Sequence, residues 1–281
     1  MRKRKKARVR IIFSRKGFDS AAGGCPSPII DGRPVSLPIP TRMPSALRYA
    51  DLTGDYGDLV EDLTRGRIKR TASCHLDPDL NANVLVRLEN WRGCLGQVAA
   101  AQSHLANNCV AKGDLFLFWG LFRPVLRQER WTYSGSREHR IFGWLQIGDI
   151  IDLGCDGSHV LRDRPWLRDH PHARDGWCQR NALYIASEQL ILDGQKTSLP
   201  GWGTFRKGHR LSAGDASPSL WTVPDWLNPQ RGGVGMTYHP PERWDADGGL
   251  QSAARGQEFI AEPAGSREAL AWLRTLFQEA A

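Results

Sequence analysis

Two long apolar segments near the middle of the chain constrain its fold more than any other feature. Residues 115–122, LFLFWGLF, follow a Gly-Asp turn, and residues 139–151, HRIFGWLQIGDII, follow a polar loop. Apolar and aromatic runs of this length, bounded by turn residues, predict two strands. Each run contains an internal glycine, Gly120 or Gly143, which permits a bend. The pair therefore predicts a curved mixed sheet or a partial β-barrel.

Residues 8–28, RVRIIFSRKGFDSAAGGCPSP, predict a further strand that ends in a polar loop. Such a loop holds reactive side chains above a sheet edge, where ligands often bind. The candidate site residues of this stretch are Ser14, Arg15, Lys16, Asp19, Ser20, Cys25 and Ser27. The alternative is a wide turn in which Asp19 and Ser20 bond to their own backbone. The loop matches neither the Walker A pattern nor G-x-G-x-x-G.

Several of these side chains suit particular chemical roles. Arg15 and Lys16 can hold an anion, the first as a flat fork and the second as a point charge. Asp19 can orient a base edge or transfer a proton. Cys25 is a candidate nucleophile because neighbouring cations can lower the pKa of its thiol, although no partner base is identifiable.

The positive charge of the chain is concentrated at its start. The net charge is +8, and residues 1–10 hold seven Lys and Arg residues, so the remainder is close to neutral. We expect residues 1–8 to form a disordered basic arm that contacts phosphates, or else a solubilising terminus. Residues 9–281 are expected to form a single α+β domain with flanking helices and long loops.

The six cysteines are scattered and contain no C-x-x-C pair. Reduced thiols in a cytoplasmic protein are the simplest interpretation. No apolar run reaches the length of a membrane span, so no membrane partner is expected.

Two histidine clusters allow more than one interpretation. His75 and Asp77 alternate on an extended segment and could act as ligands or acid/base groups, but a capped turn is the preferred interpretation. His170 and His172, near Asp169, Asp175 and Cys178, suggest a metal, yet H-x-H without a spaced third ligand is weak. We expect no metal site here, and a loop that closes over a pocket instead.

The other segments add secondary structure and further candidates. Residues 91–108 predict a helix, residues 181–192 a third long strand, and residues 254–262 a late short strand. In the late strand, Gln257 and Glu258 suit recognition of a base edge. A compact basic patch precedes it, formed by Arg206, Lys207, His209 and Arg210. Ser266 is a good N-cap for a terminal amphipathic helix.

Three segments together resemble a known family. VRIIFSRKGFDSAAGGCPSP, GDLFLFWGLFR and RIFGWLQIGDII are similar to the nucleotide modification associated domain family of the third type, over residues 8 to about 259. The resemblance implies a bacterial or phage protein that acts with modified DNA or nucleotide bases, and it implies no particular catalytic residue or cofactor. A weaker similarity, over residues 95–190, is to PUA-like domains that bind modified bases.

Two functions follow as hypotheses. The first is an enzyme acting on a base or nucleotide, with Asp19, His75, His139 or Cys25 as reactive groups, Arg15 and Lys16 on phosphate, and Gln257 or Glu258 on the base. The second is a reader without chemistry, in which an aromatic pocket at Trp119 or Trp144 takes the base. Both tryptophans also suit a plain hydrophobic core. The partner is a nucleic acid or nucleotide in either case, and a structural protein is the third possibility.

Overall fold

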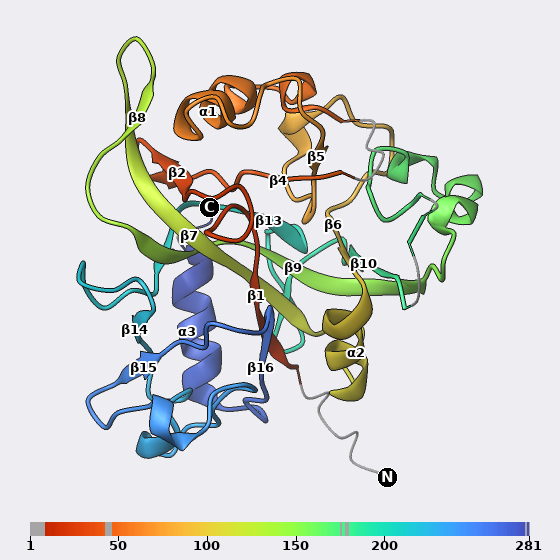
Figure 1. Ribbon diagram of the computed structural model, residues 1–281. Helices are drawn as coiled ribbons and strands as arrows, with labels where there is room; N and C mark the ends of the chain where they lie inside the picture. The colour runs from red at the N-terminus through yellow and green to blue at the C-terminus, as the bar shows by residue number, and fades with distance from the viewer. Residues whose placement is uncertain (1–8, 43–46, 175, 178–179, 279, 281) are drawn as a thin grey trace.

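Two long antiparallel strands form the centre of the protein, as the sequence predicts. In this computed structural model, β7 (Leu115–Arg127) and β9 (Glu138–Asp152) pair from Leu115 opposite Gln146 to Phe122 opposite Glu138. Figure 1 shows them as long curved ribbons that cross the molecule. The structure describes residues 9–42, 47–174, 176–177, 180–278 and 280. The predicted arm, residues 1–8, lies outside these described residues.

A ten-stranded mixed sheet is built around this pair. Its main path runs β16 (Glu258–Ala261), β1 (Ile11–Arg15), β7, β9, β10 (Ala182–Ala186) and β6 (Cys94–Gln97). β1 is parallel to β7, whereas the other neighbours on this path are antiparallel. Within the described residues the path ends at β16 and β6, so the sheet is open. The α+β prediction is confirmed, and the curvature does not close a barrel.

Shorter strands extend the sheet and its surroundings. β13 (Trp202–Arg210) pairs with β9, β2 (Ser27–Ile30) pairs with β7 and with β3 (Arg33–Pro34), and β8 (Trp131–Tyr133) pairs with β7. Among the described residues, three two-stranded sheets lie outside it: β4 (Ile39–Pro40) with β5 (Cys74–His75), β11 (Ile191–Leu192) with β12 (Gln195–Lys196), and β14 (Leu220–Thr222) with β15 (Gly249–Gln251).

The described helices are short, apart from the last one. The α-helices are α1 (Tyr56–Leu63), α2 (Ala99–Asn107) and α3 (Arg267–Gln278). The 3-10 turns are η1 (Tyr49–Asp51), η2 (Ala82–Val84), η3 (Gly157–Arg162), η4 (Pro165–Leu167), η5 (Pro229–Arg231) and η6 (Pro241–Arg243). As predicted, Ser266 caps α3: its Oγ accepts a hydrogen bond from the Ala269 N–H at 3.2 Å. No described helix has the length and apolarity that crossing a membrane requires.

The sheet is buried on both faces, because alternate residues of its strands enter different clusters. Ile11 and Phe13 of β1 pack into one core together with α3, whereas Ile12 packs into another with Leu105 of α2. A strand that is buried on both sides has apolar side chains at successive positions, which explains the apolar sequences of β1 and β7. A third cluster packs α1 against the loop after β1.

The predicted helix over residues 91–108 is wrong in its first half. Residues 94–97 form β6, which pairs with β10, and only Ala99–Asn107 is helical. Gly96 lies in this strand, against the ring of His172. A Cβ atom there would lie 2.2 Å from the ring of His172, so this position accepts only a glycine without rearrangement. The pairing with a strand some ninety residues later is a tertiary effect that overrides the local helical pattern. The third predicted strand is likewise shorter than expected, since β10 ends at Ala186.

Candidate functional site

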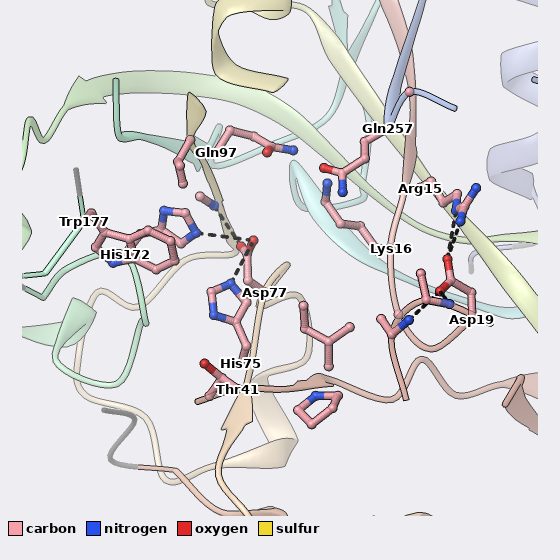
Figure 2. A pocket seen from close by; sticks show the side chains of 18 of the residues that line it. Arg15, Lys16, Asp19, Thr41, His75, Asp77, Gln97, His172, Trp177 and Gln257 are labelled. Carbon is pink, nitrogen blue, oxygen red and sulfur yellow. Dashed lines mark hydrogen bonds and ion pairs between the residues drawn. The ribbon is translucent and has the colours of Figure 1, made fainter. Parts of the chain in front are cut away.

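A polar cleft of about 490 Å³ lies beside the end of β1. Figure 2 shows side chains from several elements pointing into it. One wall comes from the loop after β1 and from residues 254–257, and the opposite wall comes from β4, β5, β6 and the loop before β10. Its polar and aromatic lining residues are Arg15, Lys16, Asp19, Thr41, His75, Asp77, Gln97, His172, Trp177 and Gln257.

The loop after β1 is a turn closed by Asp19. The Oδ1 of Asp19 accepts hydrogen bonds from the N–H groups of Ala21 and Ala22, both at 2.7 Å, and its Oδ2 accepts from Arg15. Gly23 and Gly24 follow with φ of +77° and +73°, the left-handed region that glycine tolerates. Burial would raise the pKa of Asp19, but the bonds from Ala22 and Arg15 outweigh it, so the pKa is lowered. Both oxygens of the carboxylate are therefore engaged in the loop.

Below the loop, Glu258 joins three strands of the sheet. Its Oε1 accepts hydrogen bonds from Ser14 at 3.1 Å, from Lys16 at 2.9 Å and from Gln97. Glu258 is buried and the Lys16 side chain is only 10% exposed. The carboxylate of Glu258 thus balances the positive charge of Lys16. Its ammonium group keeps N–H donors for the cleft that it lines.

Three titratable side chains meet at the opposite wall. The Oδ2 of Asp77 lies 3.8 Å from His75 Nε2 and 3.9 Å from His172 Nε2. One ligand atom from each of the three residues falls within 4.8 Å of the others. Figure 2 shows the two imidazoles on either side of the carboxylate, facing Lys16 and Gln257 across the cleft. We refer to His75, Asp77 and His172 as the His–Asp–His cluster.

The ionisation of this cluster follows from its surroundings. Burial lowers the pKa of His172 to about 4, so this imidazole is neutral at pH 7. Burial opposes ionisation of Asp77, but the neighbouring imidazoles of His170 and His75 outweigh it, and the pKa of Asp77 is lowered. Trp177 stacks on the His172 ring with centroids 4.2 Å apart and planes 12° apart. The indole covers one side of the cluster, and Trp177 also forms part of the cleft wall.

Other predicted site residues lie next to the cleft rather than in it. Ser20 and His139 line a smaller cavity of about 270 Å³, which shares Arg15, Lys16 and Asp19 with the cleft. Burial, helped by the charge of Arg15, lowers the pKa of His139 to about 4. Its Nδ1 accepts a hydrogen bond from the Trp221 indole N–H at 2.9 Å. The acid/base role of His139 stays a prediction.

Ser27 and Cys25 face the interior of the loop region. The Ser27 Oγ accepts hydrogen bonds from the backbone N–H groups of Phe18 and Leu37, at 3.3 and 3.1 Å. Cys25 packs against the third hydrophobic cluster, and burial raises the pKa of its thiol. These positions give both residues a part in holding the loop. Their predicted contacts with a nucleotide or substrate remain predictions.

Trp119 and Trp144 are core residues in this structure. Trp119 is 1% exposed and packs edge-on against Trp221, with ring centroids 4.8 Å apart. Trp144 is 3% exposed and packs between Phe205 and Phe277. Neither tryptophan lines the cleft, so their predicted base contacts gain no support from these positions.

The basic patch of the sequence lies at a different opening. Arg206 and Lys207 line a cleft of about 890 Å³ together with Arg33, and the acidic Asp31 and Asp55 also line it. Arg210 is instead paired with Glu138 and Asp215. The mixed signs of charge make this larger cleft a weaker candidate for phosphate than a uniformly basic surface would be.

The sequence interpretation missed the His–Asp–His cluster as a unit. It weighed His75 with Asp77 and, separately, His170 with His172, because nearly a hundred residues separate the two segments. Asp175 and Cys178, which it grouped with the second pair, lie outside the described residues. A useful signal was the alternation of His75 and Asp77, which points both side chains to one face of an extended segment.

The fold and the cleft define an α+β protein with a polar, partly buried site. The chain matches the family described as nucleotide modification associated domain 3 over residues 10–262 of 281. The protein therefore belongs to this family, as the three sequence segments indicate, and its setting is nucleotide or nucleic-acid modification. No curated protein and no solved structure matched the chain.

Proposed function

We propose that the protein is an enzyme that modifies a base of a nucleotide or nucleic acid in the cleft beside β1. The observation that carries the proposal is the His–Asp–His cluster, which opens on the same cleft as Lys16 and Gln257. Buried titratable groups that converge in a cleft are typical of reactive centres. Recognition alone needs stacking and hydrogen bonds, and it does not require a buried carboxylate between two imidazoles.

The side chains divide into three roles in this proposal. The His–Asp–His cluster forms the reactive centre, since its facing atoms have bonding capacity that the fold leaves unused. Lys16 contacts a phosphate with its remaining N–H donors. Gln97 and Gln257 offer amide groups to the polar edge of a base. Asp19 is the competing reactive group, and its two oxygens already hold the loop.

The decisive experiment is mass spectrometry of nucleosides from cells with and without the gene, complemented by variants. We expect a modified nucleoside that depends on the gene, that is lost with Asp77→Asn, and that persists with Asp19→Asn. Asn at position 77 keeps an acceptor for the Gly96 N–H, which bonds Asp77 Oδ1 at 2.8 Å, so this contact of the fold is retained. Loss of product with Asp19→Asn and not with Asp77→Asn would instead assign the reactive group to Asp19, in the loop after β1. No gene-dependent nucleoside would refute the enzyme.

A reader without chemistry is the second candidate, and Trp177 is the observation that favours it. Its indole lies in the cleft wall, where a base could stack on an aromatic face. This version predicts tighter binding of modified than of plain oligonucleotides, with no chemical change in either. It also predicts that Trp177→Ala weakens binding while Trp119→Phe, a change within the core, does not. Equal affinity for modified and plain oligonucleotides would contradict the reader.

A further inference from the structure

We propose that the His–Asp–His cluster binds one divalent first-row transition metal ion, with open coordination positions that face the cleft. This departs from the sequence-based expectation of no metal site. The ion's part in the reaction rests on the proposed function, whereas its binding does not. Four features of the cluster support the proposal: the spacing of the ligand atoms, the orientation of His172, the anchoring of Asp77 and the access from the cleft.

The ligand atoms have nearly the spacing of a metal site. Imidazole nitrogens and carboxylate oxygens bind such ions at about 2.0–2.2 Å, which sets two neighbouring ligand atoms of one ion roughly 3–3.6 Å apart. The two distances from Asp77 Oδ2, 3.8 and 3.9 Å, exceed this spacing by only a few tenths of an ångström. The whole set lies within 4.8 Å, so binding requires the two imidazoles to approach each other by about 1–2 Å.

A hydrogen bond fixes which nitrogen of His172 carries the proton. The Nδ1 of His172 lies 2.7 Å from Oδ1 of Asn181, while the Nδ2 of Asn181 donates to the His172 carbonyl oxygen at 3.2 Å. The amide is thereby oriented with its oxygen toward the ring, so Nδ1 is the protonated nitrogen. The lone pair of Nε2 then faces Asp77. Metal-binding histidines are commonly held in this way, by a partner on the nitrogen that does not bind the metal.

Asp77 is anchored through one oxygen and presents the other. Its Oδ1 accepts the Gly96 N–H at 2.8 Å. The Nδ1 of His170 accepts from the His172 N–H at 3.3 Å, which leaves the proton of His170 on Nε2, 3.4 Å from the same Asp77 oxygen. Within the described part of the chain no short hydrogen bond to Oδ2 is formed, and its nearest imidazole nitrogens, on His75 and His172, lie 3.8 and 3.9 Å away. At 3.9 Å the carboxylate oxygen and the His172 lone pair are two acceptors that face each other, and a cation between them satisfies both.

The ligand set selects the class of ion. Two nitrogens and one oxygen suit Zn²⁺ or Fe²⁺, whereas Mg²⁺ and Ca²⁺ prefer oxygen ligands throughout. The Asp77 side chain is 6% and the His172 side chain 3% exposed, and all three residues line the cleft. Three protein ligands leave positions for water or substrate, as in catalytic rather than structural sites. The cluster faces Lys16 and Gln257 across the cleft (Figure 2).

The test measures metal binding by the full chain without a tag, after removal of metal with a chelator. Titration calorimetry with Zn²⁺, Fe²⁺ under argon, Co²⁺ and Mg²⁺ is expected to show about one site per chain for the first three ions and none for Mg²⁺. Bound Co²⁺ should also give visible absorption bands. Asp77→Asn and His75→Gln are expected to weaken binding by at least about tenfold. His159→Gln, which changes an exposed histidine in η3, serves as the matched control and should bind as the unaltered chain does.

Each result decides the proposal. Binding that is equal in both cluster variants would overturn it, and so would the absence of a site for any transition ion. Circular dichroism of each variant establishes that it is folded, and the half-buried His75 supplies a second variant should Asp77→Asn unfold. Metal binding without a gene-dependent nucleoside would keep the metal site and refute the proposed enzyme. A gene-dependent nucleoside made by a protein that binds no metal would support the proposed enzyme and refute the metal site.

Discussion

At the scale of a single residue, Gly96 positions two side chains of the cleft. Its N–H holds Asp77, and its missing side chain makes room for the His172 ring. We expect Gly96→Ala to destabilise the protein by about 1–3 kcal/mol, because a Cβ atom would lie 2.2 Å from the ring. Urea unfolding measures this loss. Gly214→Ala is the control, since nothing lies within 4 Å of a Cβ atom there. Equal effects of both changes would show that the close approach of the His172 ring does not cause the loss of stability.

His139 links stability to pH. Its pKa is about 4 in the folded protein, chiefly because of burial, against about 6.5 in an unfolded chain. The unfolded state therefore binds more protons between these values, so this contribution is complete above about pH 6.5 and is lost as the pH falls toward 4.

We expect His139→Gln to flatten this dependence. Between pH 7 and pH 5 the unaltered protein should lose about 1–2 kcal/mol more than the variant, allowing for partial solvent screening. Urea unfolding at the two pH values gives the difference directly. His159→Gln should show the same pH dependence as the unaltered protein. If His139→Gln lost as much stability between pH 7 and pH 5 as the unaltered protein, His139 would not be the cause of this dependence.

At the scale of elements, Glu258 connects β16, β1 and β6 beneath the cleft. Glu258→Gln keeps an acceptor for Ser14 and Gln97 but leaves the Lys16 charge without its partner. Breaking a buried pair in this way costs about 3–5 kcal/mol. We expect most of that loss to be recovered when Lys16→Met is added, and denaturant unfolding of the four proteins tests it. A double variant as unstable as Glu258→Gln alone would exclude charge as the cause.

The elements differ in how well their sequences predict them. The strands β1, β7 and β9 follow from continuous apolar runs, and α3 follows from its cap and its apolar stripe. β6 does not, because CLGQ has no strand pattern of its own and is held extended by its pairing with β10 and by a bridge from Cys94 to Asp79. Local propensity is a weak guide wherever a short segment is fixed by a distant partner.

At the scale of the whole molecule, the charge is divided between a basic terminus and a nearly neutral body. Residues 2–6 contribute five Lys and Arg residues. If they contact phosphates, deleting residues 1–7 should weaken DNA binding and reduce the slope of log K against log salt by up to about 4. A chain with these five residues replaced by Ser is the matched control for length. An unchanged slope would exclude the terminus from binding.

The sequence by itself determined the α+β class, the central strands, the family and the polar loop after β1. Each of these depends on residues that are close in the chain, where hydrophobic period and turn chemistry act directly. The tertiary structure alone decided that His75 and Asp77 meet His172, that Lys16 is paired with Glu258, and that Trp119 and Trp144 lie in the core. Those contacts join segments far apart in sequence. They depend on strand pairing and on close approaches such as that at Gly96, which no local pattern records.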